Sequence, residues 1–82
     1  MIRVLFFGRL SDRAGIEPWR LPAEGIATVA DLIARVAARD PALGRELAAP
    51  EVLVAVNQRV VSRSAKVAAG DEVAFLPPVT GG

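Results

Sequence analysis

The stretch TVADLIARVAAR, Thr28 to Arg39, decides the fold, because it holds the clearest helical pattern in the chain. Its apolar residues recur at intervals of three and four positions and form one stripe: Val29, Leu32, Ile33, Val36 and Ala37. Thr28 is a good N-cap residue. Asp40-Pro41 ends the pattern, since the residue before a proline avoids the α region. We expect one main helix over residues 28–39.

Two short strands precede this helix. Residues 2–7, IRVLFF, are rich in β-branched and aromatic residues and end at a glycine, which predicts a strand. Alternation divides them into two faces, with Ile2, Val4 and Phe6 on one and Arg3, Leu5 and Phe7 on a wetter one. Residues 8–15 predict a turn or a single helical turn. Residues 16–21 predict a second strand at a sheet edge, because Pro18 has no N–H to give to a ladder.

Further strands follow the helix. Residues 42–50 hold one more irregular helical turn, with Leu43 and Leu47 inward. Residues 52–56, VLVAV, are continuously apolar, which predicts a central strand buried on both faces or nearly so. A turn at 57–59 leads to a short segment at 60–61, and residues 72–76 form the last strand. Alternation in this strand points Val73 and Phe75 inward and Glu72, Ala74 and Leu76 outward.

This order of elements predicts an α+β fold. We expect a ubiquitin-like β-grasp, in which a mixed sheet of four to five strands packs on one main helix. The first and last strands become parallel neighbours at the centre of the sheet, joined through the helical crossover. The chain is expected to form one domain over residues 1–76, followed by a flexible tail over residues 77–82.

The composition excludes most side-chain chemistry. The 82 residues include no cysteine and no histidine, which excludes disulfides, thiolate zinc sites and Cys- or His-dependent catalysis. Ten basic and nine acidic residues give a net charge of +1 with no long run of one sign, so we expect no nucleic-acid partner. Nothing approaches the ~20 apolar residues of a membrane span, and the start lacks a signal-peptide core. We expect a cytoplasmic protein without a metal or a membrane partner.

The end of the chain, FLPPVTGG (Phe75 to Gly82), differs from a simple continuation of the last strand. Pro77-Pro78 removes two backbone donors and favours an extended exit from the sheet, and the β-branched pair that follows favours extension too. Gly81-Gly82 leaves the terminal carboxylate without a neighbouring Cβ, so a narrow tunnel can admit it. Three outward apolar positions are expected beside this exit and predict a docking surface: Phe7, Leu76 and either Val60 or Val61.

Four segments together resemble the small, sulfur-carrier subunit of molybdopterin synthase: IRVLFFGRL, TVADLIARV, AVNQ and GDEVAFLPPVTGG. The resemblance implies that an activating enzyme adenylates the Gly82 carboxylate with ATP, and that a sulfur donor protein converts it to a 1-thioglycine thiocarboxylate. This group then donates sulfur to cyclic pyranopterin monophosphate in the large subunit, during molybdenum cofactor biosynthesis. The large subunit is the expected partner, in a heterotetramer.

The resemblance also implies roles for individual residues. Gly82 is the sulfur-bearing terminus and Gly81 its slender neighbour. The partner-binding residues are Phe7, Val60, Leu76, Pro77, Pro78, Val79 and Thr80. The chain is then a non-catalytic carrier subunit that binds no cofactor itself.

Three alternatives remain open. A ubiquitin-like modifier would use an activated Gly82 to form an isopeptide bond with lysines of target proteins. A sulfur carrier of another pathway, thiamine synthesis or tRNA thiolation, shares the terminal Gly-Gly. A binding module would use the tail only as a passive chain end.

Overall fold

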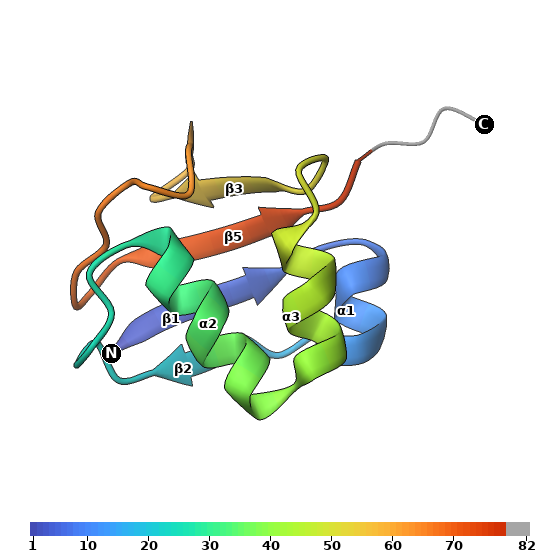
Figure 1. Cartoon of the computed structure of the whole chain (residues 1–82), viewed down its shortest axis with the longest axis horizontal. Coiled ribbons are helices and arrows are strands. Elements are labelled where there is room, and N and C mark those ends of the chain that lie inside the picture. Colours follow the sequence, from blue (N-terminus) through green and yellow to red (C-terminus); the bar gives the residue numbers. More distant parts are fainter. Residues whose placement is uncertain (79–82) are drawn as a thin grey trace.

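The computed structural model describes residues 1–78 and shows a mixed sheet with three helices against one of its faces (Figure 1). The five strands are β1 (Ile2–Phe6), β2 (Trp19–Leu21), β3 (Leu53–Val56), β4 (Arg59–Val61) and β5 (Glu72–Leu76). The helices are α1 (Arg9–Ala14), α2 (Val29–Arg39) and α3 (Pro41–Ala48). The predicted α+β β-grasp class is confirmed.

The strand order is β2-β1-β5-β3-β4. Strands β1 and β5 pair in parallel near the centre, as predicted, and the other neighbouring pairs are antiparallel. Strand β2 lies at one edge, as Pro18 indicates, and β4 lies at the other. The two ends of the described chain therefore run side by side through the middle of the sheet.

The main helix begins where the sequence predicts. The Thr28 hydroxyl accepts a hydrogen bond from the Asp31 N–H at 3.3 Å, and an Asp31 carboxylate oxygen accepts from the Thr28 N–H at 3.1 Å. This reciprocal pair is a capping box. The Asp31 carboxylate also accepts from the Ala27 N–H at 3.0 Å. Hydrogen bonds from Ala27 and Thr28 hold the pKa of Asp31 below its ordinary value.

The prediction of an irregular turn over residues 42–50 is wrong, because α3 is a regular helix. An Asp40 carboxylate oxygen accepts from the Leu43 N–H at 3.2 Å, and Pro41 occupies the first turn, where its missing N–H costs nothing. The same Asp-Pro dipeptide thus ends α2 and begins α3. Residues 8–15, where a turn or a single helical turn is predicted, contain α1, a helix of 6 residues that buries Leu10.

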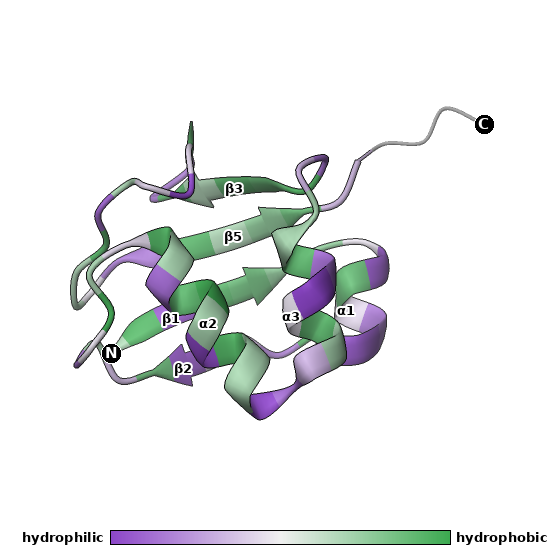
Figure 2. Cartoon of the chain, viewed as in Figure 1, coloured by the Kyte–Doolittle hydropathy of each residue, from purple (hydrophilic) through white to green (hydrophobic). Residues whose placement is uncertain are grey.

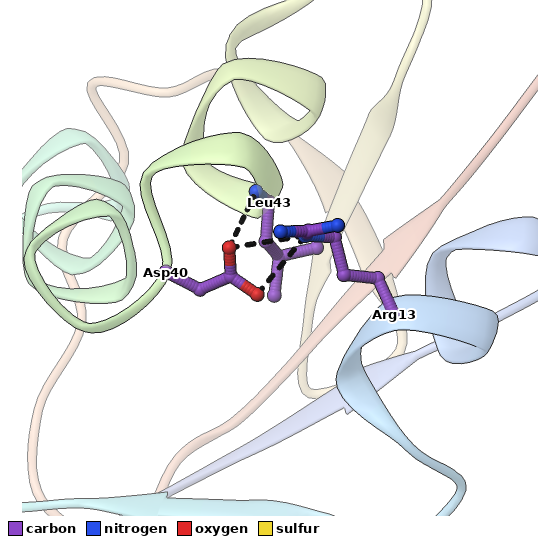
Figure 3. Close-up of polar contacts among 3 residues, drawn as sticks. All are labelled: Arg13, Asp40 and Leu43. Carbon is purple, nitrogen blue, oxygen red and sulfur yellow. Dashed lines mark hydrogen bonds and ion pairs between the residues drawn. The ribbon is translucent and has the colours of Figure 1, made fainter.

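Asp40 also ties α1 to the junction of the two longer helices. The Arg13 Nε donates to both carboxylate oxygens of Asp40, at 3.0 and 3.1 Å (Figure 3). Desolvation raises the pKa of Asp40, but the Leu43 N–H and the Arg13 guanidinium outweigh it and leave the pKa below its ordinary value. The ionised form of Asp40 is therefore the one that holds this corner together.

The core lies between the three helices and one face of the sheet. Phe75 is fully buried and stacks on Phe6 with 5.8 Å between ring centroids. The rings of Trp19 and Phe6 form a T-shaped pair with 5.2 Å between their centroids, and Trp19 Nε1 donates to the Ala14 carbonyl at 3.0 Å. Figure 2 shows β1, β3 and β5 mainly in the hydrophobic colour, whereas β2, parts of the helices and several loops carry the hydrophilic colour.

Helix α3 lies close against α2 at Gly44. A Cβ built on Gly44 would lie 2.6 Å from the Ala37 Cα, which is backbone and cannot move aside cheaply. Gly44 is buried together with Leu43 and Leu47, so the predicted inward position of these two leucines is confirmed. A side chain at position 44 would force the two helices apart.

The prediction that residues 52–56 form a strand buried on both faces is wrong. Strand β3 begins at Leu53, and this side chain is 50% exposed, whereas its neighbour Val54 is buried. The reason is that helices cover only one face of the sheet, so every second residue of β3 faces away from them. We call the uncovered side the helix-free face.

The turn from β3 to β4 fixes how the edge strand sits. Asn57 and Gln58 both have positive φ angles, 51° and 69°, as a tight two-residue hairpin requires. The Asn57 side chain accepts from the Glu72 N–H and donates to an Asp71 carboxylate oxygen, each at 3.0 Å. The hairpin that carries β4 is therefore held against the start of β5.

No helix among residues 1–78 is long and apolar enough to cross a lipid bilayer.

Candidate functional site

The helix-free face holds the outward residues that the sequence selects, arranged in rows across the strands. Phe7 follows β1, and its N–H donates to the Phe75 carbonyl at 3.1 Å, which continues the parallel pairing and places Phe7 beside Leu76. Leu76 in turn lies opposite Leu53. Phe7, Leu76 and Leu53 thus form the row at the end of the sheet where the chain leaves β5.

A second row lies on the same face, two residues further from the end of β5 at which the chain leaves the sheet. The register pairs Leu5 with Ala74, Ala74 with Ala55, and Ala55 with Val60. Both rows together make an apolar patch, which we define as Leu5, Phe7, Leu53, Ala55, Val60, Ala74 and Leu76. Three large side chains of this apolar patch are strongly exposed, at 62% for Val60, 50% for Leu53 and 47% for Phe7.

The register also decides between the two valines that the sequence left open. Val60 lies opposite Ala55 on the helix-free face, whereas Val61 lies opposite Val54 and packs against the core. Leu53 is absent from the predicted site residues, because the apolar run of residues 52–56 predicts a strand buried on both faces or nearly so. The signal was present, because an inward Val54 requires an outward Leu53.

The place where the tail leaves the sheet is built by a glycine that the sequence analysis used only as the end of a strand. Gly8 has a φ of +56°, and a Cβ on it would lie 2.7 Å from the Pro77 Cγ. The proline ring therefore lies against bare backbone between β1 and α1. The Ser11 hydroxyl donates to the Gly8 carbonyl at 2.7 Å and helps to hold this turn. Pro77 and Pro78 are both partly buried.

A third row of the helix-free face is charged. Arg20 lies opposite Arg3, and Arg3 lies beside Glu72. The Arg3 guanidinium is 3.6 Å from a Glu72 carboxylate oxygen. We call these three residues the charged row; it occupies the end of the face that is remote from Leu76. The helix-free face is thus apolar at one end and charged at the other.

The remaining predicted site residues, Val79, Thr80, Gly81 and Gly82, lie outside the described residues. Among residues 1–78 there is no cavity, and no three His, Cys, Asp or Glu residues come together in a group that could hold a metal ion. The features of the described part that bear on function are the apolar patch and the Pro77 exit beside it.

The sequence is similar to those of known proteins over its whole length. The model of the ThiS family matches residues 4–82. The molybdopterin synthase sulfur carrier subunit of Escherichia coli (strain K12) is 40% identical over 82 residues, covering 100% of each chain. The corresponding subunit of Haemophilus influenzae is 34% identical over 82 residues, again covering 100% of each.

Solved structures share the fold over almost the whole chain. SAMP1 from Haloferax volcanii superimposes with a TM-score of 0.83 at 31% identity, covering 99% of this chain and 98% of that one. A putative molybdopterin converting factor, subunit 1, from Pyrococcus furiosus gives a TM-score of 0.74 at 35% identity, covering 95% and 97%. The resemblance seen in the four sequence segments is therefore confirmed, and the chain belongs to the ThiS family, within the group of molybdopterin synthase sulfur carrier subunits.

Proposed function

We propose that this chain carries sulfur as a thiocarboxylate on Gly82 and delivers it in the cytoplasm for synthesis of the molybdenum cofactor. The observation that carries the proposal is the full-length similarity to sulfur carrier subunits, which extends through the terminal Gly-Gly. The apolar patch beside Pro77 supports it, because a carrier needs a surface that holds it while its tail enters another protein.

The first step activates a carboxylate that is otherwise a poor acyl donor. A Gly82 carboxylate oxygen attacks the α-phosphorus of ATP in the activating enzyme, and pyrophosphate leaves. The terminal sulfur of a persulfide on the donor protein then attacks the acyl carbon, and AMP leaves with the bonding pair. A thiol of the partner attacks the donor's sulfur in the resulting acyl disulfide, which forms a new disulfide and releases the Gly82 thiocarboxylate. The chain contains no Cys and no His, so the catalytic groups for both steps belong to the partners.

The second step uses the apolar patch and the tail together. Phe7, Val60 and Leu76 contact the large subunit. Leu53 extends this contact, because it lies on β3 between Leu76 of β5 and Val60 of β4. Pro77 and Pro78 direct the chain away from the sheet, so that the six residues of the tail, if extended, reach about 20 Å into the partner. Val79 and Thr80 contact the partner where the tail enters it, and Gly81 keeps the tail slender enough for a narrow tunnel.

Sulfur transfer then occurs in the large subunit. The Gly82 thiocarboxylate sulfur bonds to a carbon of cyclic pyranopterin monophosphate and displaces an oxygen substituent from that carbon. Water then hydrolyses the acyl C–S bond, which leaves the sulfur on the pterin and restores the Gly82 carboxylate. Two rounds supply the two sulfurs of the dithiolene. In this scheme the large subunit and the chain form a heterotetramer, and the chain acts as a carrier rather than a catalyst.

The activation step can be tested by incubating the full chain with the activating enzyme, ATP and a sulfur source. We expect a sulfur-for-oxygen mass change that an alkylating reagent traps at the C-terminal peptide. Trapping is required because oxidation of Met1 gives nearly the same mass change. A variant extended by one residue after Gly82 is the control, since it keeps the body of the protein and should stay unmodified. Trapped sulfur on the extended variant would refute the proposal.

The modifier function is the second candidate. It is kept because the chain is similar to solved structures of SAMP1, the small archaeal modifier protein 1 of Haloferax volcanii. Both candidates begin with adenylation of Gly82, so activation alone does not separate them. The separating experiment expresses the full chain in cells and searches for Gly82 linked to lysines of other proteins. Lysine-linked products without any trapped thiocarboxylate would replace the carrier function with the modifier function.

A further inference from the structure

The charged row is the one part of the helix-free face that the proposed function leaves without a role. Its members, Arg20, Arg3 and Glu72, lie side by side on β2, β1 and β5. Arg20 and Arg3 are exposed, and Glu72 is partly buried. These side chains therefore share the face on which a partner is expected to dock.

The two arginines occupy an unfavourable position relative to each other. They are directly opposed in the antiparallel β1–β2 pair, and like charges at opposed positions destabilise a strand pair. Glu72 is the acidic member of the row, and its carboxylate lies 3.6 Å from the Arg3 guanidinium. Within residues 1–78, Arg20 makes no ion pair. The row therefore keeps an excess positive charge centred on Arg20.

The charged row is continuous with the apolar patch. Arg3 precedes Leu5 by two residues on β1, and Glu72 precedes Ala74 by two on β5, so about 7 Å separates the rows along the strands. A stable interface covers about 800 Å² and roughly 20 to 30 residues on each partner, whereas the apolar patch has seven residues. An apolar centre with a polar rim is the usual anatomy of such interfaces. A partner docked on the apolar patch thus brings its own surface over Arg3 and Arg20.

We propose that the large subunit presents a carboxylate side chain to Arg20 and Arg3, and that this contact steers the large subunit onto the apolar patch. The inference rests on the proposed function, because it takes the large subunit as the docked partner. An acidic group suits the site because it would neutralise the excess charge and relieve the opposition of the two arginines. Charges at the rim of an interface act mainly on the association rate and its salt dependence.

The decisive variant is Arg20→Glu, examined by stopped-flow association of the full chain with the large subunit. We expect association about ten-fold slower than wild type at low salt, with the difference shrinking at high salt as the charges are screened. The change should not unfold the protein, because it replaces the like-charge pair with Arg3 by an opposite-charge pair. Thermal unfolding at or above the wild-type temperature would establish this directly. Arg20→Lys keeps the charge and should keep the wild-type rate.

Arg59→Glu is the matched control. It changes the net charge by the same amount, but Arg59 lies opposite Val56, which packs against the core, so it does not belong to the helix-free face. We expect this variant to associate nearly as fast as wild type. Equal slowing by Arg20→Glu and Arg59→Glu would overturn the inference, since net charge alone would then explain it. A wild-type rate for Arg20→Glu would also overturn it, as would an effect seen only with the activating enzyme.

Failure of this inference can be told apart from failure of the proposed function. Leu53→Ser removes part of the apolar patch without touching the charged row. If this variant binds the large subunit as tightly as wild type, docking on the apolar patch is wrong, and the inference is wrong with it. The proposed function fails separately, if the full chain yields no trapped thiocarboxylate on Gly82. If it binds weakly while Arg20→Glu and Arg59→Glu behave alike, only the carboxylate contact is wrong.

Discussion

The two faces of the sheet differ in what their apolar residues do, and Phe75 and Leu76 show the difference at neighbouring positions of β5. Phe75 is fully buried under the helices and stacks on Phe6. Leu76 points the other way, into the apolar patch beside Leu53. One residue contributes to folding, whereas we propose that the next contributes to docking. Hydrophobicity alone does not distinguish these roles, but the side of the sheet does.

The largest effect is expected on the helix-covered face. Phe75→Ala removes a fully buried ring and should lower the free energy of unfolding by about 3 to 5 kcal/mol, because the surrounding core cannot collapse around the cavity. Denaturant titration measures this loss. Leu76→Ala is the matched variant on the opposite face and should change stability much less. Equal losses for both variants would break the distinction between the two faces.

A methyl group added between α2 and α3 also tests the helix-covered side of the sheet, by overpacking it instead of leaving a cavity. Gly44→Ala should lower the free energy of unfolding by about 1 to 3 kcal/mol, because the new Cβ meets the Ala37 backbone. Helix propensity alone predicts the opposite sign, a gain of about 1 kcal/mol. The sign of the change in denaturant midpoint is therefore decisive, and stabilisation would contradict the close helix approach.

On the helix-free face the expected effect is on binding. Phe7→Ala and Leu53→Ala should each weaken the complex with the large subunit by about 1 to 3 kcal/mol, if they are central contacts. Calorimetric titration of the full chain with the large subunit measures this. Arg45→Ala serves as a control, because Arg45 is an exposed side chain on α3, which covers the other face of the sheet. An affinity loss at Arg45 as large as at Leu53 would show that the apolar patch is not the docking surface.

The smallest effect concerns the carboxylates that hold the helix ends. Asp31 and Asp40 have pKa values lowered from about 3.8, so their stabilisation is present above that pH and is lost as the pH falls through the lower folded-state values. The double variant Asp31→Asn, Asp40→Asn should therefore be less stable than wild type at pH 7, with a smaller dependence on pH below about 4. Thermal unfolding at pH 7 and pH 3 compares the two proteins. Parallel losses in both on acidification would show that other groups dominate.

Local patterns in the sequence predict most of the fold. The capping box of Thr28 and Asp31, the edge position of β2 and the parallel pairing of β1 with β5 all follow from short-range rules, and the structure confirms them. Helix α3 was missed because its start depends on Asp40, whose side chain caps the helix only after α2 has ended there. Asp40-Pro41 both ends α2 and begins α3, and the sequence pattern indicates only the first of these roles.

The candidate site was harder to predict, for a physical reason. An apolar patch on the helix-free face makes both faces of β3 apolar, so the alternation that marks a half-exposed strand disappears. The sequence pattern therefore predicts a buried Leu53, although this side chain is 50% exposed. Gly8 was missed for another reason, since its closeness to Pro77 arises from residues far apart in the sequence that the β1–β5 pairing brings together.

Single-turnover sulfur transfer tests the central claim most directly. The thiocarboxylated chain and its Leu53→Ser variant are mixed with increasing large subunit and cyclic pyranopterin monophosphate, and product formation is followed. If the apolar patch docks and the tail carries the chemistry, the variant needs more large subunit for half-maximal rate but reaches a maximal rate within about two-fold of wild type. An unchanged half-saturation point would contradict the account.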